Sequence, residues 1–206
     1  MNTVTEDSLV AITPVVVASD LEKAYAQGLF PWSGRPAHWF CPHPRAVFEL
    51  EKIHFPRRLL RLVRKKSFHI TYDTAFERVM RRCQEHHREC WIDDDIVRAF
   101  CDFHAMGYAH SVEVWQDGDL VGGLYGVHMG RMYAGESMFG RVSNASKVAF
   151  YHLVKKLESL EVELMDAQVL NPNTERFDDL SVSRVGFHGK RDKKSFPYRK
   201  LQEWGL

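Results

Sequence analysis

The feature that most constrains the fold of this chain is a run of three strands joined by two tight turns. Residues 109–115, "AHSVEVW", and residues 120–127, "LVGGLYGV", have the composition of strands, and the Asp-Gly pair of "QDGD" between them predicts a hairpin turn. A second turn, "HMGR", leads to a third strand, "MYAGES". Strands connected this tightly form an antiparallel meander. The two adjacent glycines of the middle strand, Gly122 and Gly123, indicate a bulge or a close approach of a ligand to the backbone.

The segments around the meander predict an α+β protein. Strand "FHITYD" is followed by two segments with helical spacing, residues 74–87 and 91–108. After the meander come a helix over residues 143–160, a buried strand "VELMDAQVL" and a last strand within "SRVGFHGKR". This order fits an acetyltransferase-like mixed sheet with flanking helices.

The first 50 residues differ in composition from the rest. A short helix is expected over residues 19–29, and the next 16 residues, "FPWSGRPAHWFCPHPR", contain four prolines and two tryptophans. Two interpretations are open: a rigid loop whose Trp32, Trp39 and Phe40 plug a core, or a stacking wall for a planar ligand. We therefore expect a small N-terminal subdomain, residues 1–50, and a catalytic domain, residues 51–206.

Composition narrows the function classes. The formal net charge is +1, so nucleic-acid binding requires a local patch. The apolar run near the N-terminus is too short for a membrane span and has no basic segment before it, which predicts a cytoplasmic protein without a membrane partner. The four cysteines form no C-x-x-C pair, and His86, His87 and Cys90 match no zinc spacing. We expect reduced thiols and no metal.

One segment is strongly basic. Six cations and no acid lie on an expected helix between Pro56 and Ser67: Arg57, Arg58, Arg61, Arg64, Lys65 and Lys66. Two readings are open, a solvated helix face or a patch that contacts a phosphate backbone.

Polar residues gather where the strands after the meander end. Asp166 and Gln168 are two positions apart in a strand and should face the same side. If the strand that ends with Glu136 is a neighbour, the three side chains converge, either as a site or as a polar edge. A coenzyme-A phosphate loop is not indicated, because "GGLYG" lies inside a strand and "FGRVSNASK" has no G-x-G cluster.

Several motifs, in order and with similar spacing, resemble one family. They are "AYAQGLFPW", "HWFCPHPRAVFEL", "WIDDDIVRAFCDFHAMGYAHSVEVW", "LVGGLYGV", "GESMF" and "DAQVLN", and they look like the leucyl/phenylalanyl-tRNA–protein transferase family over residues 21–174. The resemblance implies transfer of Leu or Phe, or Met, from charged tRNA to an acceptor protein with N-terminal Arg or Lys, which marks it for N-degron degradation. It implies a small N-terminal domain, an acetyltransferase-like domain and no cofactor. We expect a monomer.

The resemblance also assigns roles. Trp32 and Trp91 match an aromatic pair that holds the terminal adenosine of the tRNA, and Asp166 and Gln168 match the catalytic pair, with Glu136 at the mouth of the aminoacyl pocket. Six residues match the lining of that pocket: Leu124, Tyr133, Met138, Phe150, Leu153 and Met165. The basic segment would contact tRNA phosphates.

Two segments depart from the family pattern. The chain has "VVVASDL" where a Gly-Gly-Asp-Leu run is usual, and "NPNTERFDDLSVSRVGF" after the "DAQ" strand. A divergent paralogue with another donor or acceptor is therefore an alternative, as are a coenzyme-A-dependent N-acyltransferase and a non-catalytic binding module.

Overall fold

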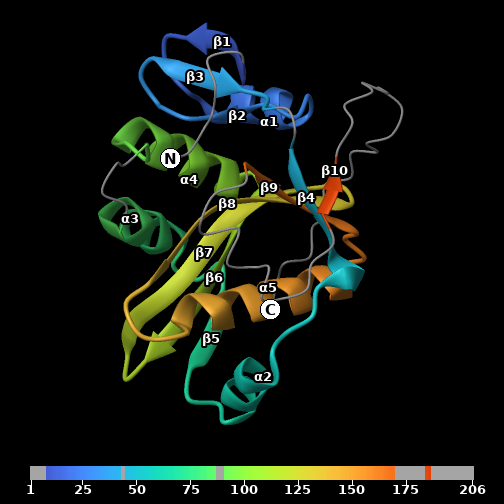
Figure 1. Ribbon diagram of the computed structural model, residues 1–206. Coiled ribbons are helices and arrows are strands. Elements are labelled where there is room, and N and C mark those ends of the chain that lie inside the picture. Colours follow the sequence, from blue (N-terminus) through green and yellow to red (C-terminus); the bar gives the residue numbers. More distant parts are fainter. Residues whose placement is uncertain (1–7, 43–44, 87–90, 170–183, 187–206) are drawn as a thin grey trace.

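The computed structural model describes residues 8–42, 45–86, 91–169 and 184–186. They form two sheets, of which the smaller has three strands in the order β1-β3-β2: β1 (Leu9–Thr13), β2 (Phe30–Pro31) and β3 (Ala37–Phe40). Together with helix α1 (Ala18–Tyr25), this sheet lies above one end of the larger sheet (Figure 1). The proline-rich segment therefore supplies two short strands rather than a loop alone.

The larger sheet has seven strands in the order β10-β4-β9-β8-β7-β6-β5. Strands β6 (Ala109–Gln116), β7 (Asp119–Met129) and β8 (Met132–Gly140) pair in antiparallel fashion, which confirms the predicted meander. Helix α5 (Ala145–Ser159) then crosses to β9 (Leu164–Gln168), which runs parallel to β8. The α+β class with a mixed sheet is thus confirmed.

The parallel pair is short. Strands β8 and β9 pair over three positions only, and the last of them joins Ala134 to Asp166. Glu136 and Gln168 lie two residues further along their strands, beyond this pairing. The sheet therefore opens at the point where these two side chains stand.

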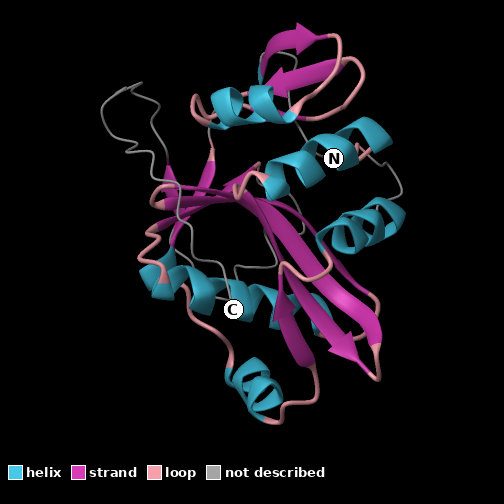
Figure 2. Ribbon diagram, turned by 180° about the vertical axis from the view of Figure 1, so that it is seen from behind, coloured by secondary structure: helices cyan, strands magenta, loops and turns pink. Residues whose placement is uncertain are grey.

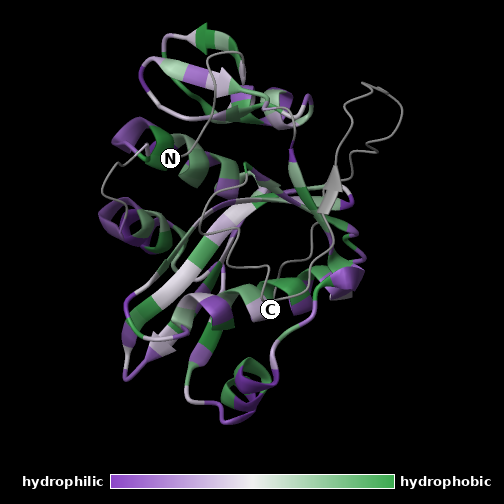
Figure 3. Ribbon diagram, in the orientation of Figure 1, coloured by the Kyte–Doolittle hydropathy of each residue, from purple (hydrophilic) through white to green (hydrophobic). Residues whose placement is uncertain are grey.

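Helices cover both faces of the larger sheet. Helix α5 packs against β6, β7 and β8 on one face, while α3 (Phe76–His86) and α4 (Asp94–Ala105) pack on the other (Figure 2). Figure 3 shows that α5 is largely hydrophobic along the length that lies against the strands. Two buried clusters result, one with α1, α3 and α4 and one with α5.

The glycine pair of the middle strand lies at a register shift, as expected, and the element that approaches its backbone closely is helix α5. A Cβ at Gly122 would lie 2.6 Å from the Cβ of Ala145, so the N-terminus of α5 approaches the strand closely there. The β6–β7 register also shifts next to Gly122, between Val114 and Trp115. A side chain at Gly122 would push the helix off the sheet.

The remaining elements lie at the edges of the larger sheet. Helix α2 (Arg57–Arg64) precedes the edge strand β5 (His69–Tyr72), and the short helix η2 (Leu50–Lys52) follows β4 (Ala46–Glu49). Strand β10 (Arg184–Gly186) pairs with β4 and lies within the expected last strand.

The expected boundary at residue 50 does not follow the strand pairing. Strand β4 pairs with β9 of the larger sheet, although residues 46–49 were assigned to the small subdomain. Local composition could not reveal this, because the pairing partner lies more than 100 residues away in the sequence. The division into two units remains a proposal, with its boundary between β3 and β4.

The sequence predicts reduced cysteines and no membrane-spanning segment. Cys41, Cys83 and Cys101 are free thiols, whereas Cys90 lies outside the described residues. None of the described helices is long and apolar enough to cross a bilayer.

Candidate active site

Three elements converge where β8 and β9 separate. The amide Nε2 of Gln168 donates a hydrogen bond of 2.6 Å to Oε1 of Glu136, and the hydroxyl of Tyr25 donates a second bond of 2.6 Å to the same oxygen. Glu136 comes from β8, Gln168 from the end of β9 and Tyr25 from the end of α1. The expected convergence of Glu136, Asp166 and Gln168 is therefore present, and Tyr25 joins it.

The direction of Gln168 is set by a turn rather than by strand alternation. Its backbone has a φ of 62°, the left-handed region that non-glycine residues rarely adopt. Its backbone N–H donates to Oδ1 of Asp166 at 2.8 Å, which holds the turn. Strand alternation alone therefore does not determine the direction of the Gln168 side chain.

A buried ion pair holds Asp166. Arg45 donates from Nε to both carboxylate oxygens at 3.0 and 2.9 Å and from Nη2 to Oδ2 at 2.7 Å, and the two side chains are 8% and 3% exposed. Arg45 Nη1 also donates to the carbonyl of Gly28, and its guanidinium lies 5.2 Å from the ring centroid of Phe30. Such a pair tolerates burial only because its hydrogen bonds are made.

The charge on Glu136 depends on this surrounding. The pKa of Glu136 is raised to about 8: burial is the largest cause and nearby Asp166 also raises it, while Tyr25, Arg45 and Gln168 partly offset the rise. The pKa of Tyr25 is raised well above its usual value by burial and by Glu136, so its hydroxyl keeps the proton that it donates. The second oxygen of Glu136, Oε2, is buried and has no hydrogen-bond partner among the described residues. Near pH 7 the raised pKa keeps Glu136 protonated, and because Oε1 already accepts two hydrogen bonds, the proton is on Oε2, which can donate to a ligand.

The aromatic segment before β4 contains one tryptophan that fills the core and one that is partly exposed. Trp39 is 3% exposed, and its Nε1 donates to Thr13 Oγ1 at 3.0 Å, so Trp39 plugs the core. Trp32 is only partly buried and packs between Phe30 and Phe40, each with ring centroids 5.7 Å away. Part of its surface remains available.

Hydrogen bonds join the loops that carry the two expected stacking residues. Trp91 is also partly buried against the same cluster as Trp32. The backbone N–H of Gly34 donates to Oδ2 of Asp93 at 2.8 Å, and Asp93 also caps α4 by accepting from the N–H of Ile96. A Cβ at Gly34 would lie 2.2 Å from Asp93 Oδ1, so any larger residue there would displace the Asp93 carboxylate.

The six residues expected to line an aminoacyl pocket lie together on the α5 face. Five of them are at most 6% exposed and belong to one cluster, with the half-buried Met138 packed at its edge: Leu124, Tyr133, Phe150, Leu153 and Met165. Packing is close near Gly135, where a Cβ would lie 2.9 Å from the methyl of Met165. The cluster is apolar and densely packed around that point.

The basic segment forms the expected helix, at a distance from the corner. Helix α2 contains four of the cations, and Lys65 and Lys66 follow it. All six side chains are exposed, and within the described part of the chain none makes an ion pair. The exposure of these side chains fits both a solvated helix face and a patch that contacts a phosphate backbone. Among the described residues, no neighbouring acid neutralises their charge.

Two histidines and an aspartate form a small cluster next to the end of β5. Asp73, His104 and His110 place ligand-type atoms within 4.8 Å of one another. Hydrogen bonds account for this proximity, because His110 Nδ1 lies 2.8 Å from Asp73 Oδ2 and His104 Nδ1 lies 2.7 Å from the carbonyl of Ala109. Of the histidines and cysteine weighed in the sequence, His87 and Cys90 lie outside the described residues.

Sequence reasoning missed two residues of the corner, Arg45 and Tyr25. Both stand inside motifs that carried the resemblance, "HWFCPHPRAVFEL" and "AYAQGLFPW". The prolines before Arg45 and the helix around Tyr25 suggested structural roles only.

Comparisons with known proteins identify the same family that the sequence motifs resemble. A family model described as "Leucyl/phenylalanyl-tRNA protein transferase" matches residues 47–191, and one described as the N-terminal domain of that protein matches residues 18–43. A protein of Gloeobacter violaceus named "Leucyl/phenylalanyl-tRNA--protein transferase" is 48% identical over 179 residues, covering 85% of this chain and 90% of the relative. Proteins of the same name from Salinibacter ruber and Pectobacterium atrosepticum are 45% and 41% identical, covering 82% and 88% of this chain and 76% and 79% of the relatives.

Similarity to solved structures is weaker. A GCN5-related N-acetyltransferase-like protein from Streptococcus suis has a TM-score of 0.42 and 16% identity, covering 81% of this chain and 64% of that one. L-PGS from Bacillus licheniformis has a TM-score of 0.43 and 8% identity, covering 78% and 53%. Because these similarities are weak, the fold is assigned from the strand order of this chain itself.

Proposed function

Since the chain belongs to the leucyl/phenylalanyl-tRNA–protein transferase family, we propose that it transfers Leu or Phe, and also Met, to the N-terminal amine of an acceptor protein. It is an aminoacyltransferase, with aminoacyl-tRNA as donor and a protein as acceptor. The proposed acceptors have N-terminal Arg or Lys, and the product enters N-degron degradation. The observation that carries the proposal is the corner of Tyr25, Glu136 and Gln168 at the edge of an apolar cluster.

The proposed donor site has an adenosine end and a side-chain end. Trp32 and Trp91 stack on the terminal adenosine, and stacking of this kind contributes about 1–3 kcal/mol per base. The side chain of Leu, Phe or Met enters the apolar cluster beside Met138, whose flexible thioether adapts to either shape. A charged side chain would lose its hydration there without gaining a partner. Near pH 7 Glu136 is protonated, so its Oε2 donates a hydrogen bond to a ribose oxygen of the donor; above the pKa of about 8 the same oxygen accepts one from a ribose hydroxyl.

Because the aminoacyl ester is already reactive, catalysis depends mainly on positioning the acceptor amine next to it. The acceptor amine attacks the ester carbon, the C–N bond forms, the C–O bond to the ribose breaks, and the ribose oxygen takes up a proton that the amine gives up. Holding both reactants in place supplies about 7–11 kcal/mol of the barrier in reactions of this type. An amide oxygen is too weak a base to remove a proton from the amine, so Gln168 acts by orienting the amine for attack.

The hydrogen bonds of the corner support that role. Because Nε2 of Gln168 is engaged by Glu136, its Oε1 is directed away and accepts from the attacking amine. Asp166 is neutralised by Arg45, so it acts by fixing the turn at Gln168 and not as a free anion for the acceptor.

The test is steady-state transfer from Phe-charged tRNA to an Arg-initiated peptide by the Gln168→Ala variant. We expect kcat to fall by at least about 10-fold, while the KM for tRNA stays within about 2-fold, because the adenosine and side-chain contacts remain. A non-reactive aminoacyl-adenosine amide serves as the control, since unchanged binding shows that the site is folded. Full turnover at saturating substrates would remove Gln168 from the mechanism.

A further inference from the structure

Glu136 occupies an irregular position in strand β8. The residues on either side of it, Gly135 and Ser137, pair with two consecutive residues of β7, so Glu136 is an extra residue without a partner on that strand. A bulge of this kind redirects one side chain, and bulges are common beside active sites. This one lies just beyond the last pair that β8 makes with β9, so the Glu136 carboxyl group stands at the opening between the two strands.

The two oxygens of the Glu136 carboxyl group have different surroundings. Oε1 accepts one hydrogen bond from the hydroxyl of Tyr25 and one from the amide of Gln168, each 2.6 Å long. Such hydrogen bonds strengthen when the carboxyl group becomes a carboxylate, so both donors lower the cost of negative charge. Oε2 is enclosed and has no hydrogen-bond partner among the described residues. One oxygen is therefore held in place, and the other can exchange a proton with a ligand.

Among the described groups of the corner, Glu136 is the one that titrates near neutral pH. Beside it, Asp166 and Arg45 form an ion pair whose charges cancel. Tyr25 and Tyr133 also interact with it, and burial raises the pKa of each tyrosine well above its usual value, so both keep their protons. The pKa of Glu136 is about 8, mainly because of burial. A group with a pKa close to the working pH can both give and take a proton during a reaction.

We propose that Glu136 relays the proton of the transfer reaction, giving the proton of Oε2 to the ribose oxygen of the donor and then taking one from the acceptor amine. The proposal rests on the proposed function, which supplies the ester and the amine. When the neutral amine attacks, the C–N bond forms and the C–O bond breaks, and the electron pair of the C–O bond stays on the ribose oxygen. That oxygen receives the Oε2 proton, and the nitrogen, which became positive on attack, returns a proton to Oε2.

The hydrogen bonds of the corner support both steps. Gln168 Nε2 is bonded to Glu136, and Gln168 Oε1 is the atom proposed to orient the amine, so the amine stands beside the same carboxyl group that meets the ribose. Between the two steps the negative charge rests on a carboxylate that keeps its hydrogen bonds from Tyr25 and Gln168. The carboxyl group ends as it began, so no other acid or base is consumed.

The first test compares leaving groups. In single turnovers with an Arg-initiated peptide, the Glu136→Gln variant should transfer Phe from its adenosine ester at least about 100-fold more slowly than wild type, because an amide cannot supply the proton. With the Phe thioester of 3′-deoxy-3′-thioadenosine, whose sulfur leaves as a thiolate and needs no proton, the variant should stay within about 3-fold of wild type. The retained thioester rate also shows that the variant is folded. Equal losses with both donors, or no loss with the ester, would overturn the proposal.

The second test follows the same single-turnover rate with pH. With the ester, the wild-type rate should rise as the amine loses its proton and then fall, about 10-fold per pH unit, once Glu136 has lost its own proton. The Glu136→Gln variant should show the rise without the fall. A wild-type rate that does not fall, or a fall that persists in the variant, would overturn the proposal.

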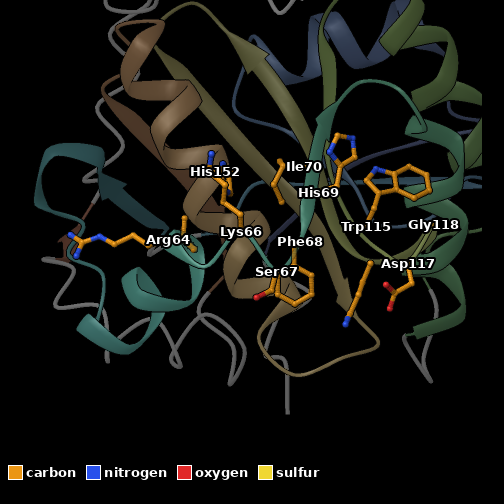
Figure 4. A pocket seen from close by; sticks show the side chains of 12 residues that line it. Arg64, Lys66, Ser67, Phe68, His69, Ile70, Trp115, Asp117, Gly118 and His152 are labelled. Atoms are coloured by element: carbon orange, nitrogen blue, oxygen red, sulfur yellow. The ribbon is translucent and has the colours of Figure 1, made fainter.

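Asp117 provides the matched control. It is exposed and is the only acid among the described residues that line a hollow between α2, β5 and the β6–β7 turn (Figure 4). This turn lies about 25 Å along β7 from Tyr125, which pairs with the neighbour of Glu136. Asp117→Asn removes a carboxyl group at a φ of 52°, a conformation that Asn also adopts, and it should retain the wild-type rates and pH profile. Losses equal to those of Glu136→Gln would show a general effect of charge and overturn the relay.

Failure of the proposed function gives a different result. The proposed function fails if the wild-type protein transfers no amino acid to the peptide from charged tRNA or from the adenosine ester, and the relay then fails with it. Transfer by the wild type, together with equal losses of ester and thioester rates in Glu136→Gln, removes the relay alone.

Discussion

Replacing Glu136 by Gln should change how the stability of the protein depends on pH. The pKa of Glu136 is raised from 4.5 to about 8 in the folded protein, chiefly by burial. Between these values the folded protein holds a proton that the unfolded chain has released. The contribution of this group is therefore favourable at low pH and is lost as the pH rises through that window, and above it the loss is complete.

The size of the effect follows from the shift. Each pH unit within the window changes the free energy of unfolding by about 1.36 kcal/mol, so between about pH 5.5 and about pH 8.5 the wild-type protein should lose about 3 kcal/mol through this group. The Glu136→Gln variant has no group to titrate and should not show this loss. A constant offset is expected too, because an amide nitrogen would replace the unpartnered Oε2.

The measurement is urea unfolding of both proteins at several pH values and one ionic strength, with the free energies extrapolated to water. All other titrating groups are shared, so the difference between the two curves isolates Glu136 and its coupling to Tyr25, Asp166 and Arg45. The variant should gain relative to wild type as the pH rises. Curves that stay parallel within about 0.5 kcal/mol would refute the raised pKa and with it the enclosed state of this carboxyl.

Three further predictions concern the elements around the corner. Arg45→Met leaves Asp166 buried and unpaired, so it should cost about 3–5 kcal/mol and lower the Tm by about 6–20 °C in calorimetry, whereas a loss no larger than that of an exposed arginine would contradict the buried pair. Gly34→Ala should raise the KM for aminoacyl-adenosine with little change in kcat, because its Cβ would meet the carboxylate of Asp93 and part the two tryptophan loops; an unaltered KM would show that the loops act independently. Met138→Trp should reduce kcat/KM for Phe-tRNA more than for Leu-tRNA, since the larger ring has less room, and equal losses would argue against a pocket at this place.

The elements that sequence predicted well are those with local signals. The meander followed from the turn residues of "QDGD" and "HMGR", and the helices followed from apolar spacing and from the acids at the start of α4. The strand of Asp166 was also correct in type and nearly in extent. Each of these depends on residues within about two turns of helix or one hairpin, which is the range over which pattern and propensity act.

The electrostatics of the corner had no local signal. Arg45 pairs with Asp166 across 121 positions, and Tyr25 reaches Glu136 across 111. The left-handed backbone of Gln168 was also unpredictable, since it depends on the carboxylate that receives its N–H and not on a glycine. Spacing could suggest which acids and amides meet, but not which of them are neutralised when they do.

The corner joins the N-terminal part of the chain to the larger sheet. Tyr25 and the carbonyl of Gly28 come from the region of the small sheet, and they satisfy Glu136 and Arg45 of the larger one. Exchanging the first 40 residues with those of a relative therefore replaces partners of buried charged groups, not a separable appendage. A chimera between relatives would keep these contacts only if both parts came from one parent, or if the two parents have the same residues at the contacting positions.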